Sequence, residues 1–284
     1  MNPVSRYIDT GETTLHCLEW ENDGPPALLL HGASFCASVW SSMGRMLSKK
    51  FRVLSLDLRG HGDSGKPPGM FSWEHLVADF VNLVDALNLD DVLLIGHSRG
   101  GGVSALGSSL RPDRFSKAVF IEPSLSLGST RPSNQPRRSV SGGSSSPTHL
   151  RRAVWPNRNA IFERYRKAEV FQNWREDILW DYIDGGTYTQ EDGQLVLKCT
   201  PEIERQISEA RTPDYMFESL ANIRFPVLHV TSENKMRWPD SVPAIQIIRA
   251  SASSFRHVVV SDASHYIPQE KPEILEDLVQ EFIA

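Results

Sequence analysis

The sequence predicts an α/β protein in which helices flank a mostly parallel central β-sheet and a helical segment interrupts the chain. Two observations predict this class. Short apolar runs typical of strands alternate with segments whose apolar residues recur at helical spacing. This alternation stops after Pro123 and resumes near residue 214. We therefore expect a sheet domain formed by residues 1–123 and 214–284, with residues 124–213 inserted into it.

Strands are expected wherever a short run is rich in aliphatic and aromatic residues. The first two runs form an opening hairpin, and the run at residues 91–97 is apolar almost throughout, as in a strand buried on both faces of a sheet. The expected strands before the insertion are residues 6–11, 13–21, 25–32, 51–65 (a strand that runs into a loop), 91–97 and 114–123.

Helices are expected between these strands. The clearest covers residues 72–88, and Ser72 can cap it because its hydroxyl accepts a hydrogen bond from a backbone N–H of the first turn. Its apolar residues that fall on one face are Leu76, Phe80, Leu83, Val84 and Leu87. Two more helices are expected at residues 38–50 and 100–110. After the insertion we expect strands at 224–232 and 256–264 and helices at 241–251 and 271–284.

The inserted segment has two parts. Residues 124–148 are dominated by Ser, Gly, Pro and Arg, which predicts a flexible surface segment. Residues 149–213 are rich in helical patterns and hold Trp155, Trp174 and Trp180, which either line an apolar pocket or hold a small helical layer together. Because open α/β sheets bind ligands at the carboxyl ends of their strands, and the insertion follows such an end, we expect it to act as a lid.

Composition limits the class of protein. The net charge of −5 gives no reason to expect nucleic acid as a partner, and no apolar run approaches the roughly 18 residues of a membrane span. The N-terminus lacks the basic and apolar pattern of a secretory signal. Three widely spaced cysteines, Cys17, Cys36 and Cys199, suit a reducing compartment. We expect a cytoplasmic protein.

A serine flanked by glycines is the clearest chemical motif. Residues 96–100 read Gly-His-Ser-Arg-Gly, between an expected strand and an expected helix. A sharp turn there leaves no room for side chains two residues on either side of the serine, and it projects the hydroxyl outward. The pattern predicts that Ser98 is a nucleophile. The alternative is a glycine turn that serves only packing.

Four motifs together resemble those of the α/β-hydrolase superfamily, and they occur in the same order. They read LLLHGASFCASVW, LDLRGHGDS, LLIGHSRGG and SHYIPQEKPE. The resemblance covers nearly the whole chain. It implies the α/β-hydrolase fold with an inserted helical lid, and hydrolysis without a cofactor.

The resemblance assigns further residues of the site. His265, in the last motif, is then the general base that takes the Ser98 proton and returns it to the leaving group. Two backbone N–H groups stabilise the oxyanion: that of Arg99, which follows the nucleophile, and that of Ala33, which follows the His-Gly pair.

The acid of the triad has two candidates. Most relatives carry an aspartate after the strand that residues 224–232 resemble, but residues 232–235 here read Ser-Glu-Asn-Lys. Some subgroups place the acid one strand earlier, where this chain has Glu122. We favour Glu122 over Glu233, with Asp240 as a fallback, although Glu122 could merely cap the entry to the lid. Asp57 resembles a structural loop residue.

Several chemistries are disfavoured. Dehalogenases and epoxide hydrolases of this fold use a carboxylate nucleophile, whereas this elbow holds a serine. The nine histidines are scattered, and neither H-E-x-x-H nor paired CxxC occurs, so we expect no metal site. No Lys-Ser/Thr pair follows the glycines after Ser98, as a phosphate-binding loop would require.

The beginning of the insertion is strongly basic. Residues 124–167 contain nine Arg or Lys residues against Glu163 alone, a formal charge of +8, which leaves −13 on the remaining chain. The charge either attracts an anionic acyl substrate or keeps a solvated segment soluble.

The sequence thus predicts a serine hydrolase that cleaves a carboxylic ester, lactone or thioester through an acyl-enzyme on Ser98. Carbon–carbon bond hydrolysis, acyl transfer and perhydrolysis are alternatives on the same fold. A non-catalytic hydrolase-like receptor that binds a small ligand is the alternative from another class.

Overall fold

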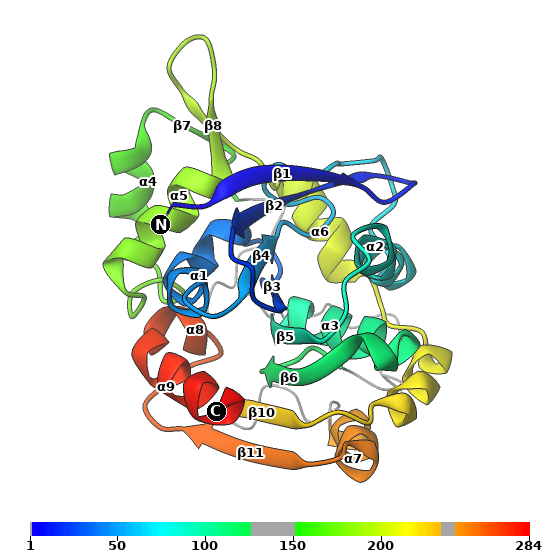
Figure 1. Cartoon of the computed structure of the whole chain (residues 1–284). Coiled ribbons are helices and arrows are strands. Elements are labelled where there is room, and N and C mark those ends of the chain that lie inside the picture. The colour runs from blue at the N-terminus through cyan, green and yellow to red at the C-terminus, as the bar shows by residue number, and fades with distance from the viewer. Residues whose placement is uncertain (1, 126–150, 234–241) are drawn as a thin grey trace.

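The sheet predicted from the sequence is the centre of the structure, a computed structural model that describes residues 2–125, 151–233 and 242–284. Eight strands follow the order β1-β2-β4-β3-β5-β6-β10-β11 (Figure 1). The hairpin β1–β2 is antiparallel and β2 pairs antiparallel with β4, whereas all later pairs are parallel. The strands are β1 Val4–Asp9, β2 Thr14–Trp20, β3 Pro26–Leu30, β4 Arg52–Leu56, β5 Val92–His97, β6 Phe115–Ile121, β10 Val227–Ser232 and β11 Phe255–Val260.

Helices cover both faces of this sheet (Figure 1). They are α1 Ser41–Leu47, α2 Trp73–Ala86, α3 Arg99–Leu110, α7 Val242–Ser251, α8 Ile267–Glu270 and α9 Pro272–Ile283. The 3₁₀ segments are η1 Ala37–Trp40, η2 Pro112–Arg114 and the longer η4 Asp214–Asn222. Ser72 caps α2 as predicted, since its hydroxyl accepts the His75 N–H at 3.5 Å. The predicted elements of the sheet domain are therefore confirmed, with α1 shorter than expected because its first turn is 3₁₀.

Two apolar clusters form the core, one on each face of the sheet. Leu28 and Leu30 of β3 join α2 and α3 on one face. Ala27 and Leu29 of the same strand join α1 and α9 on the other. Since successive side chains of a strand point to opposite faces, a continuous apolar run is what a strand covered on both faces needs.

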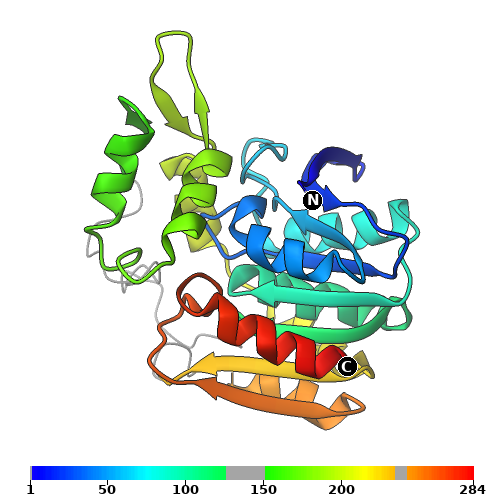
Figure 2. The same ribbon diagram turned by 60° about the vertical axis from the view of Figure 1, so that its left-hand side comes forward.

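Residues 151–213, the described insertion apart from its first two residues, are called the cap here. It lies beyond the carboxyl ends of the parallel strands (Figure 2). Its elements are β7 Val154–Trp155, α4 Arg158–Tyr165, α5 Glu176–Gly186, β8 Thr187–Thr189, β9 Leu195–Leu197 and α6 Pro201–Glu209. The sequence prediction of a helix-rich insertion did not include the antiparallel sheet β7-β9-β8, because strands of two or three residues are too short to show a periodicity of two. The predicted flexible segment lies almost wholly outside the described residues.

The three tryptophans of the cap differ in what they pack against. Trp155 packs on Tyr165, and Trp180 stacks on Phe162 with ring centres 4.2 Å apart, so both hold the cap together. Trp174 instead reaches the sheet domain, where its ring centre lies 5.0 Å from that of Phe35.

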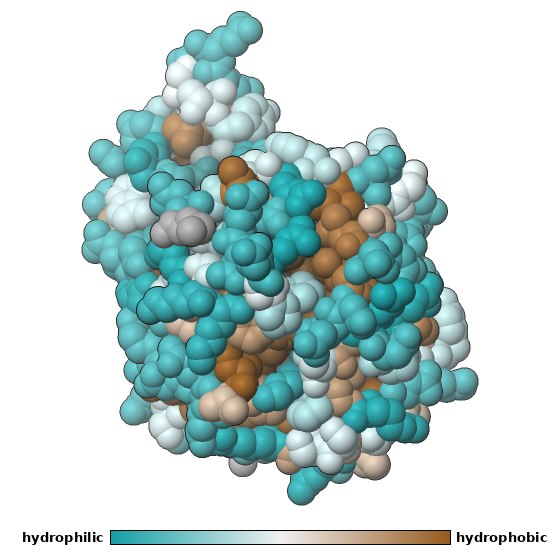
Figure 3. All heavy atoms as spheres, in the orientation of Figure 1, coloured by the Kyte–Doolittle hydropathy of each residue, from teal (hydrophilic) through white to brown (hydrophobic). Residues whose placement is uncertain are grey.

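The surface shows mainly hydrophilic side chains on the face drawn in Figure 3, with hydrophobic residues in small separate areas. None of the helices within the described ranges is both long enough and apolar enough to cross a membrane.

Candidate active site

Ser98 occupies a sharp turn between β5 and α3. Its φ of 53° is a left-handed conformation that costs a non-glycine residue free energy. A Cβ atom on Gly100 would meet the carbonyl oxygens of Leu30 and His31, and one on Gly96 would lie 2.7 Å from the Gly100 carbonyl oxygen. The glycines are thus required by close backbone contacts on both sides of the serine, as the motif predicted.

Ser98 and His265 are 167 residues apart in sequence but in direct contact. The Oγ of Ser98 lies 2.8 Å from Nε2 of His265, which follows β11. On the other side of the ring, Nδ1 lies 3.3 Å from Oε2 of Glu122, at the end of β6. All three residues are buried. With Nδ1–H directed at Glu122, Nε2 can accept the Ser98 proton.

Glu122 is held as an ionised acceptor. Its Oε1 accepts hydrogen bonds from the Ser232 N–H at 2.6 Å and from the Ser232 hydroxyl at 3.0 Å. Burial raises the pKa of Glu122, but the bonds from His265 and Ser232 outweigh burial, so the pKa lies below its ordinary value. A carboxylate that stays charged can orient His265 and stabilise its imidazolium form.

The other acid candidates differ in their position. Glu233 is exposed, and Asp240 lies outside the described residues. Ser232, the last residue of β10, lies three positions before the one where the resemblance would put an aspartate, and it donates two hydrogen bonds to Glu122. Of the described candidates, Glu122 is the one that contacts His265.

The two expected oxyanion donors lie on neighbouring segments. Arg99 is the first residue of α3, at the positive end of the helix dipole. Ala33 is half-buried in the loop after β3, and its N–H has no acceptor among the residues that the structure describes. The Gly100 N–H donates to the His31 carbonyl at 3.1 Å and so ties this loop to the start of α3.

The family assignment follows from comparison with known proteins. The family model described as the alpha/beta hydrolase family matches residues 27–278. The chain belongs to this family. The α/β hydrolase is 25% identical over 285 residues to 2-(acetamidomethylene)succinate hydrolase from Mesorhizobium japonicum. The alignment covers 99% of this chain and 95% of the relative.

Two solved structures have the same fold as this α/β hydrolase. E-2-(acetamidomethylene)succinate hydrolase superposes with a TM-score of 0.79 at 23% identity, and 99% of each chain is covered. The thioesterase domain from the curacin biosynthetic pathway gives 0.77 at 18% identity, with 99% of this chain and 100% of that domain covered. The predicted α/β-hydrolase fold is confirmed.

Three further histidines support the site. His97 lies beneath His265, and its Nε2–H donates to the His265 carbonyl at 2.8 Å. Burial and the neighbouring His265 lower the pKa of His97 well below its ordinary value, so the ring stays neutral. His31 and His61 brace the loop of Ala33, because His31 bonds Gly32 at 2.7 Å and His61 accepts the Ser34 N–H at 3.0 Å.

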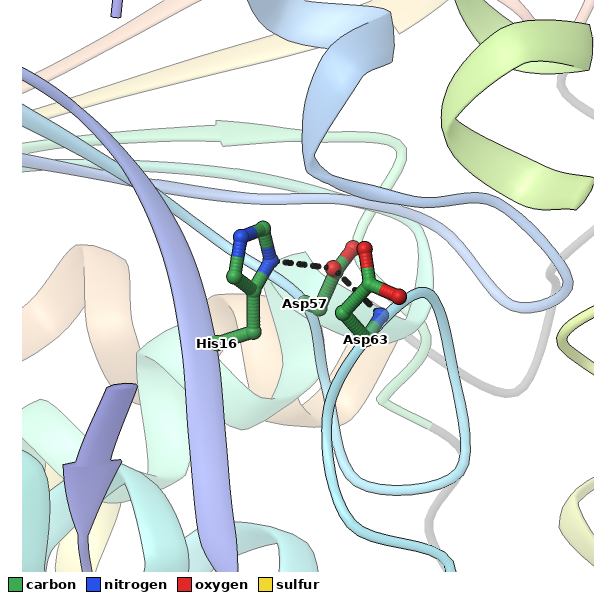
Figure 4. Close-up of side chains that lie close together, drawn as sticks. All are labelled: His16, Asp57 and Asp63. Carbon is green, nitrogen blue, oxygen red and sulfur yellow. Dashed lines mark hydrogen bonds and ion pairs between the residues drawn. The ribbon is translucent and has the colours of Figure 1, made fainter. Parts of the chain in front are cut away.

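One cluster was not anticipated from the sequence. His16, Asp57 and Asp63 each offer a possible metal ligand within 4.8 Å of one another (Figure 4). Asp57 already accepts hydrogen bonds from His16 Nδ1 at 2.7 Å, from the Asp63 N–H at 2.9 Å and from the Ala37 N–H at 2.6 Å. Asp63 pairs with Lys198 at 2.7 Å. These partners fit the structural role expected for Asp57.

Glu122→Gln is expected to lower kcat by roughly 10²- to 10⁴-fold. If the amide oxygen keeps the Ser232 bonds, its NH₂ group faces Nδ1 and favours the histidine tautomer that cannot accept the Ser98 proton. Glu233→Gln is the matched control and should leave turnover unchanged. Both are measured at one pH with folding checked by circular dichroism. A large loss of turnover in Glu233→Gln, together with wild-type turnover in Glu122→Gln, would show that the triad acid follows the later strand, β10.

Proposed function

We propose that this α/β hydrolase is a serine hydrolase that cleaves a carboxylic ester, lactone or thioester through an acyl-enzyme on Ser98. The observation that carries the proposal is the continuous contact from Ser98 Oγ through His265 to Glu122, at 2.8 and 3.3 Å. Nucleophile, base and orienting acid within hydrogen-bond reach are what acyl transfer to a serine requires.

The reaction proceeds in two halves. Ser98 Oγ bonds to the substrate carbonyl carbon as its proton passes to His265 Nε2, and the N–H groups of Arg99 and Ala33 stabilise the oxyanion. The carbon–oxygen or carbon–sulfur bond then breaks and the leaving group takes the proton from His265. Water repeats the sequence: its proton goes to His265, its oxygen bonds to the acyl carbon, and Ser98 leaves with the proton returned.

We propose that the insertion, residues 124–213, acts as a lid and supplies an apolar wall. Phe35, two residues after the oxyanion donor Ala33, has ring contacts with Trp174 and Tyr182 of the cap and with Tyr266 next to His265. Such a wall favours an acyl group with a hydrocarbon portion.

The charge of the insertion gives weak support for an anionic substrate. Of the nine cations in residues 124–167, Arg158, Arg166 and Lys167 form ion pairs on the surface, with Asp184, Glu176 and Glu163. These pairs favour the alternative in which the charge keeps a solvated segment soluble. The relative named for a succinate derivative that bears an acetamido group nevertheless makes anionic substrates and amides necessary members of a substrate panel.

The test is active-site labelling followed by turnover. The wild-type protein is treated with a fluorophosphonate, the modified peptide is identified by mass spectrometry, and p-nitrophenyl esters, lactones, acyl-CoAs and carboxylated amides are assayed in turn. We expect modification at Ser98 and turnover of at least one ester, lactone or thioester. If Ser98 is not labelled and no substrate is turned over, the result supports a ligand-binding role. If only substrates with other bond types are turned over, the protein catalyses a different reaction from the one proposed.

A further inference from the structure

The loop that carries Ala33 is joined to the cap through Ser34. The Ser34 hydroxyl donates to Oε1 of Glu204 in α6 at 2.7 Å. The Ser34 carbonyl accepts the hydroxyl of Tyr182, from α5, at 2.9 Å. On the side of the sheet domain, the Ser34 N–H donates to His61 Nε2. The hydroxyl, carbonyl and N–H of Ser34 are therefore all engaged, two of them by the cap.

Arg151 connects these cap residues to one another. Its guanidinium donates to Oε2 of Glu204 at 3.0 Å, to the hydroxyl of Tyr165 at 2.7 Å and to that of Tyr182 at 2.6 Å. Glu204 and Tyr182 are buried, so their positions depend on this arginine. Burial raises the pKa of Tyr182 well above its ordinary value, which keeps its hydroxyl protonated and able to donate to Ser34.

Ser34 needs this support because its backbone is strained. Its φ is 70°, in the left-handed region that disfavours a residue with a Cβ atom. A strained residue persists only where surrounding contacts hold it. Ser34 is bonded directly to Ala33, so the contacts that hold Ser34 in this conformation also fix the position of Ala33, whose N–H lies in the preceding peptide.

We propose that Glu204 and Tyr182 are positioning residues for the oxyanion hole, so that the cap assembles this part of the site as well as covering it. The inference rests on the proposed function, in which the Ala33 N–H contacts the substrate oxygen. It predicts that breaking the contacts at Ser34 weakens binding of the transition state more than binding of the substrate.

The matched control is Ser38, four residues further along. Its hydroxyl donates to the Asp181 carbonyl of α5 at 2.6 Å, so Ser38→Ala also removes one serine contact between sheet domain and cap. It leaves the contacts of Ser34 in place. A role limited to fastening the cap would make Ser34→Ala and Ser38→Ala equivalent.

The experiment compares Ser34→Ala, Glu204→Gln, Tyr182→Phe and Ser38→Ala in the full-length protein, with p-nitrophenyl acetate as the substrate. The first three should lower kcat by roughly 10- to 100-fold with KM changed little, less than the loss of a complete oxyanion donor. They should weaken inhibition by an alkyl trifluoromethyl ketone, whose serine adduct carries an oxyanion, by a similar factor. Binding of the matching methyl ketone should change little. Ser38→Ala should leave all four quantities near wild type.

Two results would overturn the inference. One is a kcat for Ser34→Ala and Glu204→Gln that equals that of Ser38→Ala while thermal denaturation shows all three folded. The other is an equal loss of affinity for both ketones, which would mean a distorted pocket. Failure of the proposed serine-hydrolase function would be recognised by a different result, because turnover would then not depend on Ser98. If Tyr182→Phe fails to fold, Ser34→Ala tests the inference in its place, because this substitution removes only an oxygen atom.

Discussion

Ser98→Ala is expected to lower ester turnover by about 10⁶-fold and to leave the fold intact, because it removes the nucleophile of a triad. The hydroxyl makes its hydrogen bond to His265, whereas the backbone of Ser98 is held by its own bonds: its N–H donates to Ile121, and its carbonyl accepts from Gly102 and Ser124. Alanine preserves those backbone bonds. The measurement is kcat/KM on p-nitrophenyl esters, with thermal denaturation to verify folding.

The control for this variant is Ser104→Ala in α3, the helix that follows Ser98. Ser104 is also fully buried, and within the described ranges its hydroxyl has no hydrogen-bond partner. Its removal should change neither turnover nor fluorophosphonate labelling. Substantial turnover by purified Ser98→Ala, with labelling retained at another residue, would refute Ser98 as the nucleophile.

His265→Ala is expected to cause a comparable loss, and Ser98→Ala combined with His265→Ala should be little worse than either change alone. The two side chains act as a unit, because an alcohol that cannot lose its proton is a weak nucleophile and a base without the alcohol has nothing to activate. The measurement is a double-mutant comparison of kcat.

Because imidazole groups on a protein surface can themselves hydrolyse activated esters, the comparison needs a surface histidine. His257 is exposed on β11, the strand that leads to His265, and His257→Ala should be silent. If the losses of kcat in the two single mutants multiply in the double mutant, Ser98 and His265 act independently and do not form one triad.

The sheet domain was predictable because its signals are local. The apolar runs of β3 and β5 and the helical periodicity of α2 each occupy a single stretch of chain, and each reports the surface that the element buries. The elbow at Ser98 is local as well, because the glycines that relieve its close contacts lie two residues away on either side. The short strands of the cap carry no such signal.

The choice between the acid candidates depends on the tertiary structure. In the sequence, Glu122 and Glu233 are both carboxylates at the end of an expected strand. The parallel pairing of β6 with β10 brings Ile121 level with Val230, so the next residue, Glu122, reaches the two donors of Ser232 and the ring of His265. Pairing of that kind joins residues more than 100 positions apart, and no spacing along the chain records it.

By itself, then, the sequence determined the fold class and the position of Ser98 on its turn, since each depends on neighbours in the chain. The candidacy of His265 came from the resemblance of its motif to those of the α/β-hydrolase superfamily. Only the tertiary structure decided which carboxylate contacts His265, and that the cap reaches Ser34 through Glu204 and Tyr182. The physical reason is the same in both cases. A hydrogen bond depends on the distance and direction between two groups, and for residues far apart in sequence these are determined by strand register and by the packing of the cap on the sheet domain.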